Sequence, residues 1–599
     1  MEFGGWFGRA LRVDLSTGGV SEERIDSGVL FTWLGGRGLG VHTVAREVHP
    51  CCDPLSSANK LVFAVGPLTG AGVPGAGRFC AVTKSPLTNT ILDSGAGGRW
   101  GQRLKGSGYD MLIIQGVAPE PVFLSIAPGN ITLHKAEGLW GCEVSETVGL
   151  LQEQLGADTS VACIGPAGEN LVSFSSVMCD EHRALGRGGL GAVLGSKNLK
   201  AITVTGKQKA PVFLPDKLRF LLYETGKWLK ANPITSQGLP EFGTPVLVNI
   251  FDRLGVFPSH NFQNTGKINA GAISGEAIAL GYAGKPRGCY GCPVQCSRQL
   301  QLQGNHFKSP EYESLWALGP QCGIDHPETI FAANNLCNQL GLDTISTGVT
   351  IGCAMELAER GLLDLPTPIA FGDRHGLLRT IKEIAYQEAG GQLLGQGSRR
   401  LAELCGQSYY AMEVKRLELS AYDPRGMQGM GLGFATSNRG GCHLRGYMAA
   451  MEALGAPKMI DRIATDGKAG LTINLQNISA AMDSLISCRF INLAVAEEYF
   501  ARILAAVTGR DYQPQDLHLI GERIWNLERL YNNRVGFDRS ADTLPQRLLT
   551  EPISHGPSRG QVACLEPMLT EYYRYRGWTA DGQPTPEKIR RLGLEEYLC

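Results

Sequence analysis

The sequence predicts an α+β fold in which a β-rich N-terminal domain precedes two largely α-helical domains. Two observations lead to this prediction. A chain of 599 residues is longer than one hydrophobic core usually organises, and it suggests roughly three or four domains. Along the chain, short alternating segments with closely spaced turn residues give way near residue 210 to the spacing of amphipathic helices.

Residues 1–210 contain the segments that predict strands. They are GRALRVDLSTG, KLVFAVGPLTG, DMLIIQGVAPEPVFLSIAPGNITLHKA and LKAITVTG. Each places alternating or apolar residues beside turn residues, as expected for short strands joined by turns. The segment KQKAPVFLPD (207–216) then brings Pro, Lys and a change of period, which indicates a linker.

Helical patterns dominate after the linker. DKLRFLLYETGKWLKAN opens the region, and DHPETIFAANNLCNQLG (325–341) has Asp, then Pro, then Glu, the expected order at a helix start. NLQNISAAMDSLIS and LHLIGERIWNLERLYNN predict two later helices. A weaker boundary at KRLELSAY (415–422) divides this part into domains at 211–418 and 419–599.

Charge and apolar runs exclude two classes of partner. The 56 basic and 57 acidic residues give a net charge of −1, so no basic field attracts nucleic acid or an anionic membrane. No apolar run approaches the roughly 18 residues of a membrane span, and the N-terminus lacks the pattern of a signal peptide. We therefore expect no nucleic acid, no membrane and a cytoplasmic location. The 17 dispersed cysteines favour a reducing compartment over a disulfide scaffold.

Glycine is in excess, with 78 residues, about 13% of the chain, against a usual share of about 7%. The glycines cluster in LGGRGLG (34–40), SGAGGRWG (94–101) and GRGGLGAVLGSKN (186–198). Because glycine lets backbone approach a ligand closely, we interpret these pieces as loops that grip one large ligand from several sides. Tight turns between strands are the alternative.

The stretch RGCYGCPVQCSR places Cys289, Cys292 and Cys296 within eight residues. The C-x2-C-x3-C spacing suits zinc or an iron–sulfur cluster. A second C-x2-C or H-x3-H pair is missing nearby, which favours a four-iron cluster over zinc and over a chance grouping. The fourth thiol could come from several cysteines: Cys322, Cys337, Cys353, Cys442 and Cys488. A cluster transfers single electrons, so a second centre must carry out any two-electron reaction.

Ordered motifs extend this picture over the whole chain. They are WLGGRGLG, GPLTGAGVPGAGRFCAVTKSPLTNTILDSGAGG, RALGRGGLGAVLGSKNLKAI, CYGCPVQC, PEYES, LGLDTIS, GCHLRGY, DSLISC and TPEKIRRLGL. With these motifs the chain resembles the tungsten-containing aldehyde:ferredoxin oxidoreductase family. The resemblance implies that the β-rich domain forms a base under two pyranopterins, which the helical domains cover. It also implies tungsten or molybdenum held by the pterin sulfurs, Mg2+ bridging the pterin phosphates, and a [4Fe-4S] cluster alongside.

The resemblance also assigns residues. It gives Cys289, Cys292, Cys296 and Cys488 to the cluster, Arg78 and Arg183 to the phosphates, and the backbone carbonyls of Gly95 and Ala184 to Mg2+. It gives Asn338, Asp343 and Asp483 to the pterin edges. Two motifs depart from the family pattern. DSLISC carries Ile486 and Ser487 where Gly and Leu are usual, and NQLGLD carries Asn338 where Asp is usual. An amide both donates and accepts hydrogen bonds, whereas an ionised Asp only accepts.

The resemblance makes Glu313, in PEYES, and His443, in GCHLRGY, an acid/base pair near the metal. A carboxylate can accept a proton from water, and a histidine that titrates near neutrality can hydrogen-bond the aldehyde oxygen and pass protons on. The structural alternatives are a solvated helix start and a histidine satisfied within the fold. Glu311 is the alternative base if the motif match shifts by two residues.

The expected function is the oxidation of aldehydes to carboxylic acids, with electrons passed through the cluster to ferredoxin or an iron–sulfur electron-transfer subunit. One alternative on the same scaffold is a catalytic subunit of the aromatic acyl-CoA reductase type. An alternative of a different class is an electron-transfer subunit that keeps the cluster but lacks the metal–pterin. A zinc-stabilised binding protein is a third. The sequence is compatible with a homo-oligomer.

Overall fold

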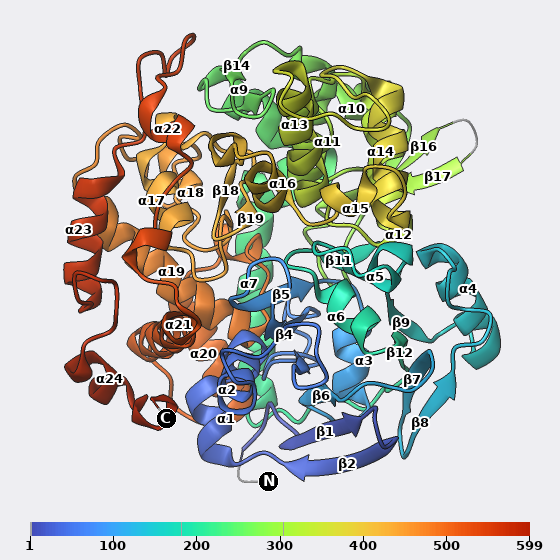
Figure 1. Cartoon of the computed structure of the whole chain (residues 1–599). Helices are drawn as coiled ribbons and strands as arrows, with labels where there is room; N and C mark the ends of the chain where they lie inside the picture. The colour runs from blue at the N-terminus through green and yellow to red at the C-terminus, as the bar shows by residue number, and fades with distance from the viewer. Residues whose placement is uncertain (1–2, 181, 303–304, 599) are drawn as a thin grey trace.

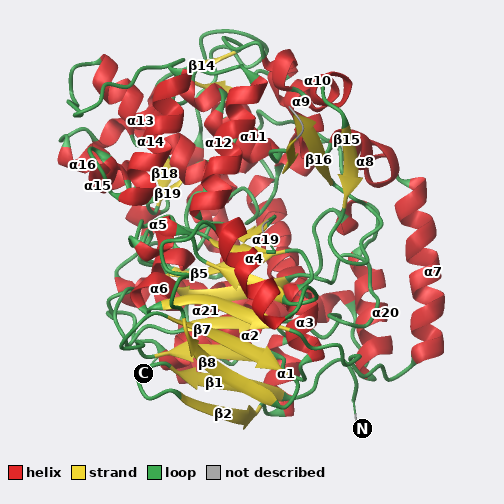
Figure 2. Ribbon diagram, turned by 90° about the vertical axis from the view of Figure 1, so that its right-hand side faces the viewer, coloured by secondary structure: helices red, strands yellow, loops and turns green. Residues whose placement is uncertain are grey.

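The computed structural model describes residues 3–180, 182–302 and 305–598. Two six-stranded sheets lie in the N-terminal part, at the bottom of Figure 1, and helices form most of the remainder above and beside them. Figure 2, a side view, shows the same division, with the strands of the two large sheets gathered in the lower half. The predicted α+β fold class is confirmed.

The first sheet has the strand order β2-β1-β6-β3-β4-β5. Its strands are β1 (Arg9–Asp14), β2 (Gly19–Arg24), β3 (Leu61–Ala64), β4 (Phe79–Lys84), β5 (Ile91–Ala96) and β6 (Met111–Gln115). β1 and β6 run parallel, and the other neighbours are antiparallel. All residues of β3 and β4 are buried, which matches the apolar runs of these segments.

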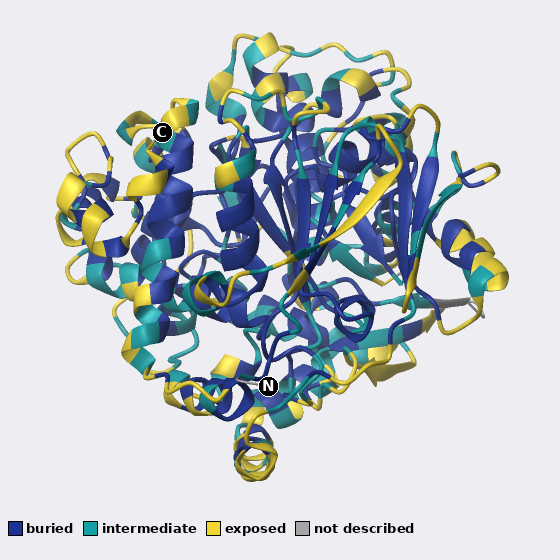
Figure 3. Ribbon diagram, turned by 90° about the horizontal axis from the view of Figure 1, so that it is seen from below, coloured by how far each residue is buried: buried dark blue, intermediate teal, exposed yellow. Residues whose placement is uncertain are grey.

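The second sheet has the order β11-β10-β9-β12-β7-β8. Its strands are β7 (Val122–Ala127), β8 (Asn130–Lys135), β9 (Ser160–Cys163), β10 (Val177–Cys179), β11 (Arg183–Leu185) and β12 (Leu199–Val204). Apolar side chains from both sheets form one buried cluster, so the sheets pack against each other. Figure 3, seen from below, shows most of the strands as buried. Two strand segments face the helical part: the end of β5 and the edge strand β11.

One of the three glycine-rich pieces, 34–40, does not form the expected loop. LGGRGLG (34–40) connects α1 (Ser27–Trp33) to α2 (Gly36–Glu47) and supplies the first turns of α2, and 186–198 leads into α6 (Leu190–Ser196). A Cβ atom on Gly40 would lie 2.4 Å from Cγ2 of Val82, so glycine here serves close packing of α2 on the sheet. In the other two pieces the loops are short: 97–99 joins β5 to α3 (Trp100–Gly106), and 186–189 joins β11 to α6.

The four predicted helices are present as α7 (Pro215–Ala231), α12 (Pro327–Leu340), α19 (Lys468–Leu485) and α21 (Pro514–Val535). The N-cap of α12 is His326 rather than Asp325, because the His326 ring accepts the Thr329 N–H at 3.3 Å. The other helices are α4 (Val144–Leu155), α5 (Pro166–Glu169), α8 (Leu239–Phe242), α9 (Leu247–Arg253), α10 (Gly275–Gly281), α11 (Tyr312–Leu318), α13 (Thr344–Glu359), α14 (Arg374–Tyr386), α15 (Gly391–Leu394), α16 (Ser398–Leu404), α17 (Gln428–Thr436), α18 (Ala449–Glu452), α20 (Glu497–Thr508), α22 (Gln546–Thr550), α23 (Leu565–Arg576) and α24 (Pro586–Leu592).

Short strands also occur within the helical part. They are β13 (Pro258–Ser259), β14 (Asn264–Thr265), β15 (Gly284–Arg287), β16 (Ser297–Leu302), β17 (Asn305–Lys308), β18 (Glu413–Val414) and β19 (Leu417–Glu418). β18 and β19 fall at the predicted boundary near 418, and apolar residues on both sides of it share one buried cluster. The domain limits 1–210, 211–418 and 419–599 stay a prediction.

Among the described residues, no helix combines the length and the apolar character that crossing a membrane requires.

Candidate active site

Two adjoining cavities lie where the helical part meets β5 and β11. The first, of about 280 Å³, is the thiol cavity, and it is lined by the four cysteines of the predicted cluster site. The second, of about 310 Å³, is the acid–base cavity, and it is lined by Glu313 and His443. Both are lined by Arg78, Gly95, Ala184, Gly186, Glu311 and Asp343. Each residue that the sequence predicted for the site lines at least one of the two cavities.

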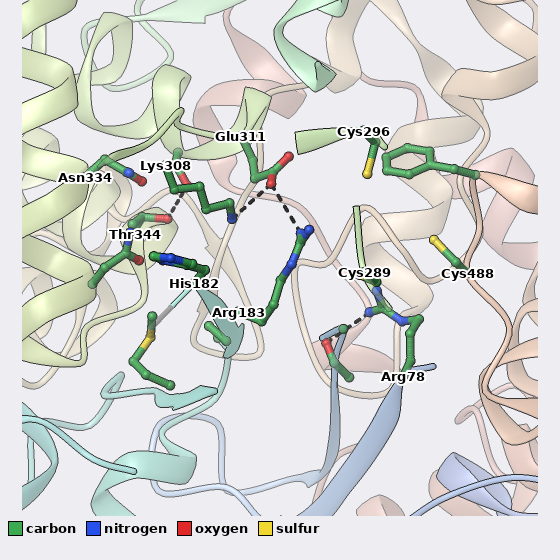
Figure 4. A pocket seen from close by; sticks show the side chains of 18 of the residues that line it. Arg78, His182, Arg183, Cys289, Cys296, Lys308, Glu311, Asn334, Thr344 and Cys488 are labelled. Carbon is green, nitrogen blue, oxygen red and sulfur yellow. Dashed lines mark hydrogen bonds and ion pairs between the residues drawn. The ribbon is translucent and has the colours of Figure 1, made fainter. Parts of the chain in front are cut away.

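Four thiols from two distant segments meet at the thiol cavity. Cys289, Cys292 and Cys296 come from the loop between β15 and β16, and Cys488 follows α19. Figure 4 shows Cys289, Cys296 and Cys488 near one another, with Arg78 below them. The other candidates for the fourth thiol do not line this cavity: Cys322, Cys337, Cys353 and Cys442 are buried in the helical core.

The thiols ring the cavity rather than meet at one point. Among the described residues, no three His, Cys, Asp or Glu side chains come close enough together to hold one metal ion. Burial raises the pKa of Cys292 and of Cys296. In this surrounding the protonated thiol is favoured until a cation or cluster is bound.

Glycine and arginine line the wall between the two cavities. Arg78 Nη2 donates to the carbonyl oxygen of Gly95 at 3.1 Å. A Cβ atom on Gly97 would lie only 2.5 Å from the sulfur of Cys289, so the chain needs glycine there. Arg183, on β11, extends toward Glu311 with an N–O distance of 3.8 Å (Figure 4).

Glu311 is engaged in ion pairs. Its Oε1 lies 3.0 Å from Nζ of Lys308, and its Oε2 accepts the Thr244 hydroxyl at 2.8 Å. Although burial opposes it, Lys308 and Arg183 hold the pKa of Glu311 below its usual value. Glu311 is therefore an ionised partner of two cations at neutral pH, which disfavours it as the alternative base.

Glu313 and His443 face each other in the acid–base cavity. Glu313 lies in the first turn of α11, and His443 lies between α17 and α18. His443 Nε2 is 3.6 Å from Glu313 Oε1. The other carboxyl oxygen, Oε2, accepts the Ala421 N–H at 2.9 Å. Glu313 Oε1 and His443 Nδ1 are buried without a hydrogen-bond partner among the described residues.

Burial sets unexpected protonation states for this pair. It raises the pKa of Glu313 to about 8. Burial, together with Arg187 and Arg439, lowers the pKa of His443 well below 6.5. At neutral pH, Glu313 therefore mostly carries its proton and His443 is neutral, whereas the sequence analysis expected a carboxylate and a histidine titrating near neutrality. The difference arises because burial penalises the charged form of both groups.

The three residues predicted for the pterin edges lie at different parts of the cavities. Asp343 caps α13 and accepts the Arg187 Nε–H at 3.1 Å. Asp483, on α19, accepts from Arg445 Nη1 at 3.0 Å. Asn338, on α12, lines the thiol cavity. Both carboxylates are thus fixed by arginines that the sequence analysis did not select.

The departure from the family pattern in DSLISC keeps a left-handed turn. Ile486 ends α19 with φ 63° and ψ 33°, a conformation in which glycine is more usual than a β-branched residue. Its side chain packs against Gly36 and Gly66. A Cβ atom on Gly36 would lie 2.5 Å from Cδ1 of Ile486, and a Cβ atom on Gly66 would lie 3.0 Å from Cγ1 of Ile486.

Sequence reasoning missed a group of buried arginines. Arg187, Arg439 and Arg445 line the acid–base cavity. Arg439 Nη2 donates to the sulfur of Cys442 at 2.8 Å, and Arg445 also bonds the carboxylate of Asp93. The signal was available, since Arg187 and Arg445 stand within the motifs RALGRGG and GCHLRGY, but arginine is usually exposed.

Several buried polar atoms in and beside the acid–base cavity lack a hydrogen-bond partner among the described residues. They are Glu313 Oε1, His443 Nδ1, Arg439 Nε, Arg445 Nε, Ser487 Oγ and Arg489 Nη2. Buried polar groups are rarely unsatisfied in proteins, so their concentration indicates a polar ligand at this place. The excess of guanidinium groups fits an anionic one. The donor set therefore fits a phosphate-bearing cofactor, and the four thiols fit a cluster.

Comparison with known proteins identifies the family. The model of the aldehyde ferredoxin oxidoreductase N-terminal domain matches residues 10–206, and the model of domains 2 and 3 matches residues 221–594. The chain belongs to the aldehyde ferredoxin oxidoreductase family. It is an oxidoreductase, as the resemblance implied.

Relatives in the aldehyde ferredoxin oxidoreductase family match the chain from end to end. The tungsten-containing aldehyde ferredoxin oxidoreductase of Pyrococcus furiosus is 44% identical, over 99% of this chain and 100% of the relative. The enzyme of the same name from Thermococcus kodakarensis is 43% identical, over 100% of both. Among solved structures, the active site complex BamBC of benzoyl coenzyme A reductase has the same fold. Its TM-score is 0.86 at 22% identity, over 100% of this chain and 98% of that one.

Proposed function

We propose that this protein oxidises aldehydes to carboxylic acids at a bis-pyranopterin tungsten or molybdenum centre. Electrons leave singly through a [4Fe-4S] cluster to ferredoxin or an iron–sulfur partner subunit. One observation carries the proposal: a cavity ringed by four thiols adjoins a cavity that holds a protonated glutamic acid beside a neutral histidine. The thiol cavity would serve electron transfer, and the neighbouring acid–base cavity would serve proton transfer.

Cys289, Cys292, Cys296 and Cys488 would hold the cluster. Thiols distributed around a cavity suit a cluster of several atoms better than a single zinc ion, which needs its ligands at one point. Cluster binding would also offset the cost of deprotonating these thiols, because iron stabilises the thiolates that burial alone disfavours.

The pterin groups would lie across both cavities. Arg78 and Arg183 would bind their phosphates, and the carbonyls of Gly95 and Ala184 would bind Mg2+. Asp343, Asp483 and Asn338 would hydrogen-bond the pterin edges. When bound, the metal–pterin centre supplies the two-electron oxidation that the cluster lacks.

The reaction adds one oxygen atom from water to the aldehyde and releases two protons and two electrons. Glu313, when ionised, accepts a proton from water at Oε1, the carboxyl oxygen that makes no hydrogen bond to the described residues. Neutral His443 donates an N–H to the aldehyde oxygen and so orients the carbonyl. Their separation of 3.6 Å lets them exchange a proton through a small adjustment.

Elemental analysis of anaerobically purified protein tests the proposal, followed by benzyl viologen reduction with a panel of aldehydes. We expect tungsten or molybdenum, about four iron atoms per chain and aldehyde-dependent reduction of the dye. Protein that carries zinc and neither iron nor the heavy metal would overturn the proposal. Activity with aromatic acyl-CoA in place of aldehydes would replace the reaction while keeping the cofactors.

A further inference from the structure

A basic face lies directly outside the thiol cavity. Its first part is a hollow of about 410 Å³ that shares His182, Arg183 and Lys308 with the thiol cavity. A second hollow of about 420 Å³ joins it through Arg99 and Tyr290. Figure 2 looks onto this side, with α3 and α4 below and β15 and β16 above. The thiol cavity and this face are therefore lined in part by the same residues.

The cysteine loop itself is exposed on this face. All four residues of β15 are exposed, and Tyr290, next to Cys289, is 63% exposed. A one-electron carrier that contacts this loop would lie next to the segment that supplies three of the four thiols. Short distance matters because electron tunnelling weakens steeply with separation.

Charge on this face differs sharply from charge on the whole chain. Leaving aside Arg183 and Lys308, which pair with Glu311, five cations line the two hollows: Arg99, Arg103, Lys207, Arg287 and Arg298. The carboxylates among the described lining residues are Asp158 and Asp180. The chain as a whole has a net charge of −1, so this positive face is a local concentration.

Three of the five cations share two carboxylates, and the other two have none among the described residues. Asp158 lies within 3.5 Å of Arg99, Arg103 and Lys207. Asp180 also pairs with Arg99, at 3.7 Å. No carboxylate in the described part of the chain forms an ion pair with Arg287 or Arg298. Arg298 instead donates to backbone carbonyls, including that of Gly284. The face therefore keeps a positive field toward solvent.

We propose that this basic face is the docking site of a small, soluble, acidic electron-carrier protein that exchanges single electrons with the cluster. The inference rests on the proposed function, which places the cluster at the adjacent thiols. The face favours a transient carrier over a permanently bound subunit, because permanent interfaces are large and apolar, whereas this one is charged and offers Tyr290 as its large apolar group. Electrostatic steering suits brief encounters that need high association rates.

The test uses the full-length holoenzyme and a double variant, Lys207→Glu with Arg287→Glu. Neither residue lines the thiol or acid–base cavity. The matched control is Arg574→Glu with Arg591→Glu, whose side chains are 72% and 57% exposed on α23 and α24, on the opposite side in Figure 1. Iron content and benzyl viologen reduction, expected to be unchanged in both variants, report intact protein.

The probe is a purified [4Fe-4S] ferredoxin rich in Asp and Glu. We measure its aldehyde-dependent reduction and, separately, its equilibrium binding, each at low and high salt. In the face variant we expect kcat/KM for ferredoxin and its binding affinity to fall about tenfold or more at low salt, and much less at high salt. The control should match the unmodified protein.

Three results would overturn the docking site. They are unchanged ferredoxin kinetics and binding in the face variant, an equal loss in the control, and a tightly bound subunit that shields Lys207 from chemical acetylation. The measurement of ferredoxin binding tests the docking site independently of the aldehyde reaction. Salt-sensitive ferredoxin binding that the face variant abolishes, in protein that oxidises no aldehyde, would support the docking site and refute the aldehyde reaction.

Discussion

If Glu313 takes a proton from water during aldehyde oxidation, the rate depends on the small fraction of this side chain that is ionised at neutral pH. Burial raises its pKa to about 8, so roughly one molecule in ten has the ionised form at pH 7 and about nine in ten at pH 9. We therefore expect kcat/KM to rise about tenfold between pH 7 and pH 9 and then to level off.

Substitutions at Glu313 and Glu311 distinguish the roles of these two carboxyl groups. Glu313→Gln keeps the shape and removes the base, so aldehyde turnover should fall by about 10²–10⁴ and the rise with pH should disappear. Glu311→Gln is the matched control. Because Glu311 is already ionised at neutral pH, this variant should keep the rise of kcat/KM between pH 7 and 9. The assay is viologen-coupled oxidation from pH 6 to 9.5, with tungsten and iron measured in each variant.

Two results would refute this reasoning. One is a rate that is flat or falls between pH 7 and 9 in the unmodified protein. The other is a Glu313→Gln variant with full metal content that keeps more than about a third of the activity. Infrared difference spectra give an independent check, since unmodified protein minus Glu313→Gln should show a protonated-carboxyl C=O band at pH 6 that is lost above pH 9.

Three further predictions concern cofactor retention and stability. Cys488→Ser should lose the iron and the visible absorption of the cluster, whereas Cys564→Ser, at an exposed cysteine, should keep both. Asn338→Leu removes one hydrogen bond to the cofactor, so the tungsten content that remains after gel filtration should fall by about tenfold or more. Asn338→Asp should keep the metal. Arg445→Met leaves buried Asp93 and half-buried Asp483 without this partner, so it should lower the free energy of unfolding by about 3–5 kcal/mol, measured with urea. Arg400→Met, at an exposed site, should change it by about 0.5 kcal/mol or less.

Local patterns predicted the features that depend on neighbouring residues. The strands β1, β3, β6 and β12 and the helix α7 follow from apolar spacing and turn residues within about ten positions. The spacing of Cys289, Cys292 and Cys296 likewise indicated a shared site. The family resemblance, rather than spacing, selected Cys488, which the fold brings to the same cavity from almost 200 residues away.

Features that depend on distant contacts were not predicted. Arg445 bonds the carboxylate of Asp93 across 352 residues, and no local pattern distinguishes it from an exposed arginine. The glycine-rich piece 34–40 was interpreted as a ligand-binding loop. Gly40 instead lets α2 pack closely on Val82, a contact with a distant part of the chain that the local sequence does not indicate. The raised pKa of Glu313 depends on burial, which the sequence PEYES does not encode.

The carboxyl groups of the acid–base cavity divide into two kinds. Against the effect of burial, Arg445, Arg37 and Arg439 hold the pKa of Asp93 well below its usual value. Asp343 and Asp483 are also bonded to arginine. Glu313 is different, because its Oε1 faces His443, a histidine that burial keeps neutral. Arginines thus fix the other carboxylates as charge partners, while burial leaves Glu313 with a pKa near the operating pH, which is the condition for efficient proton transfer.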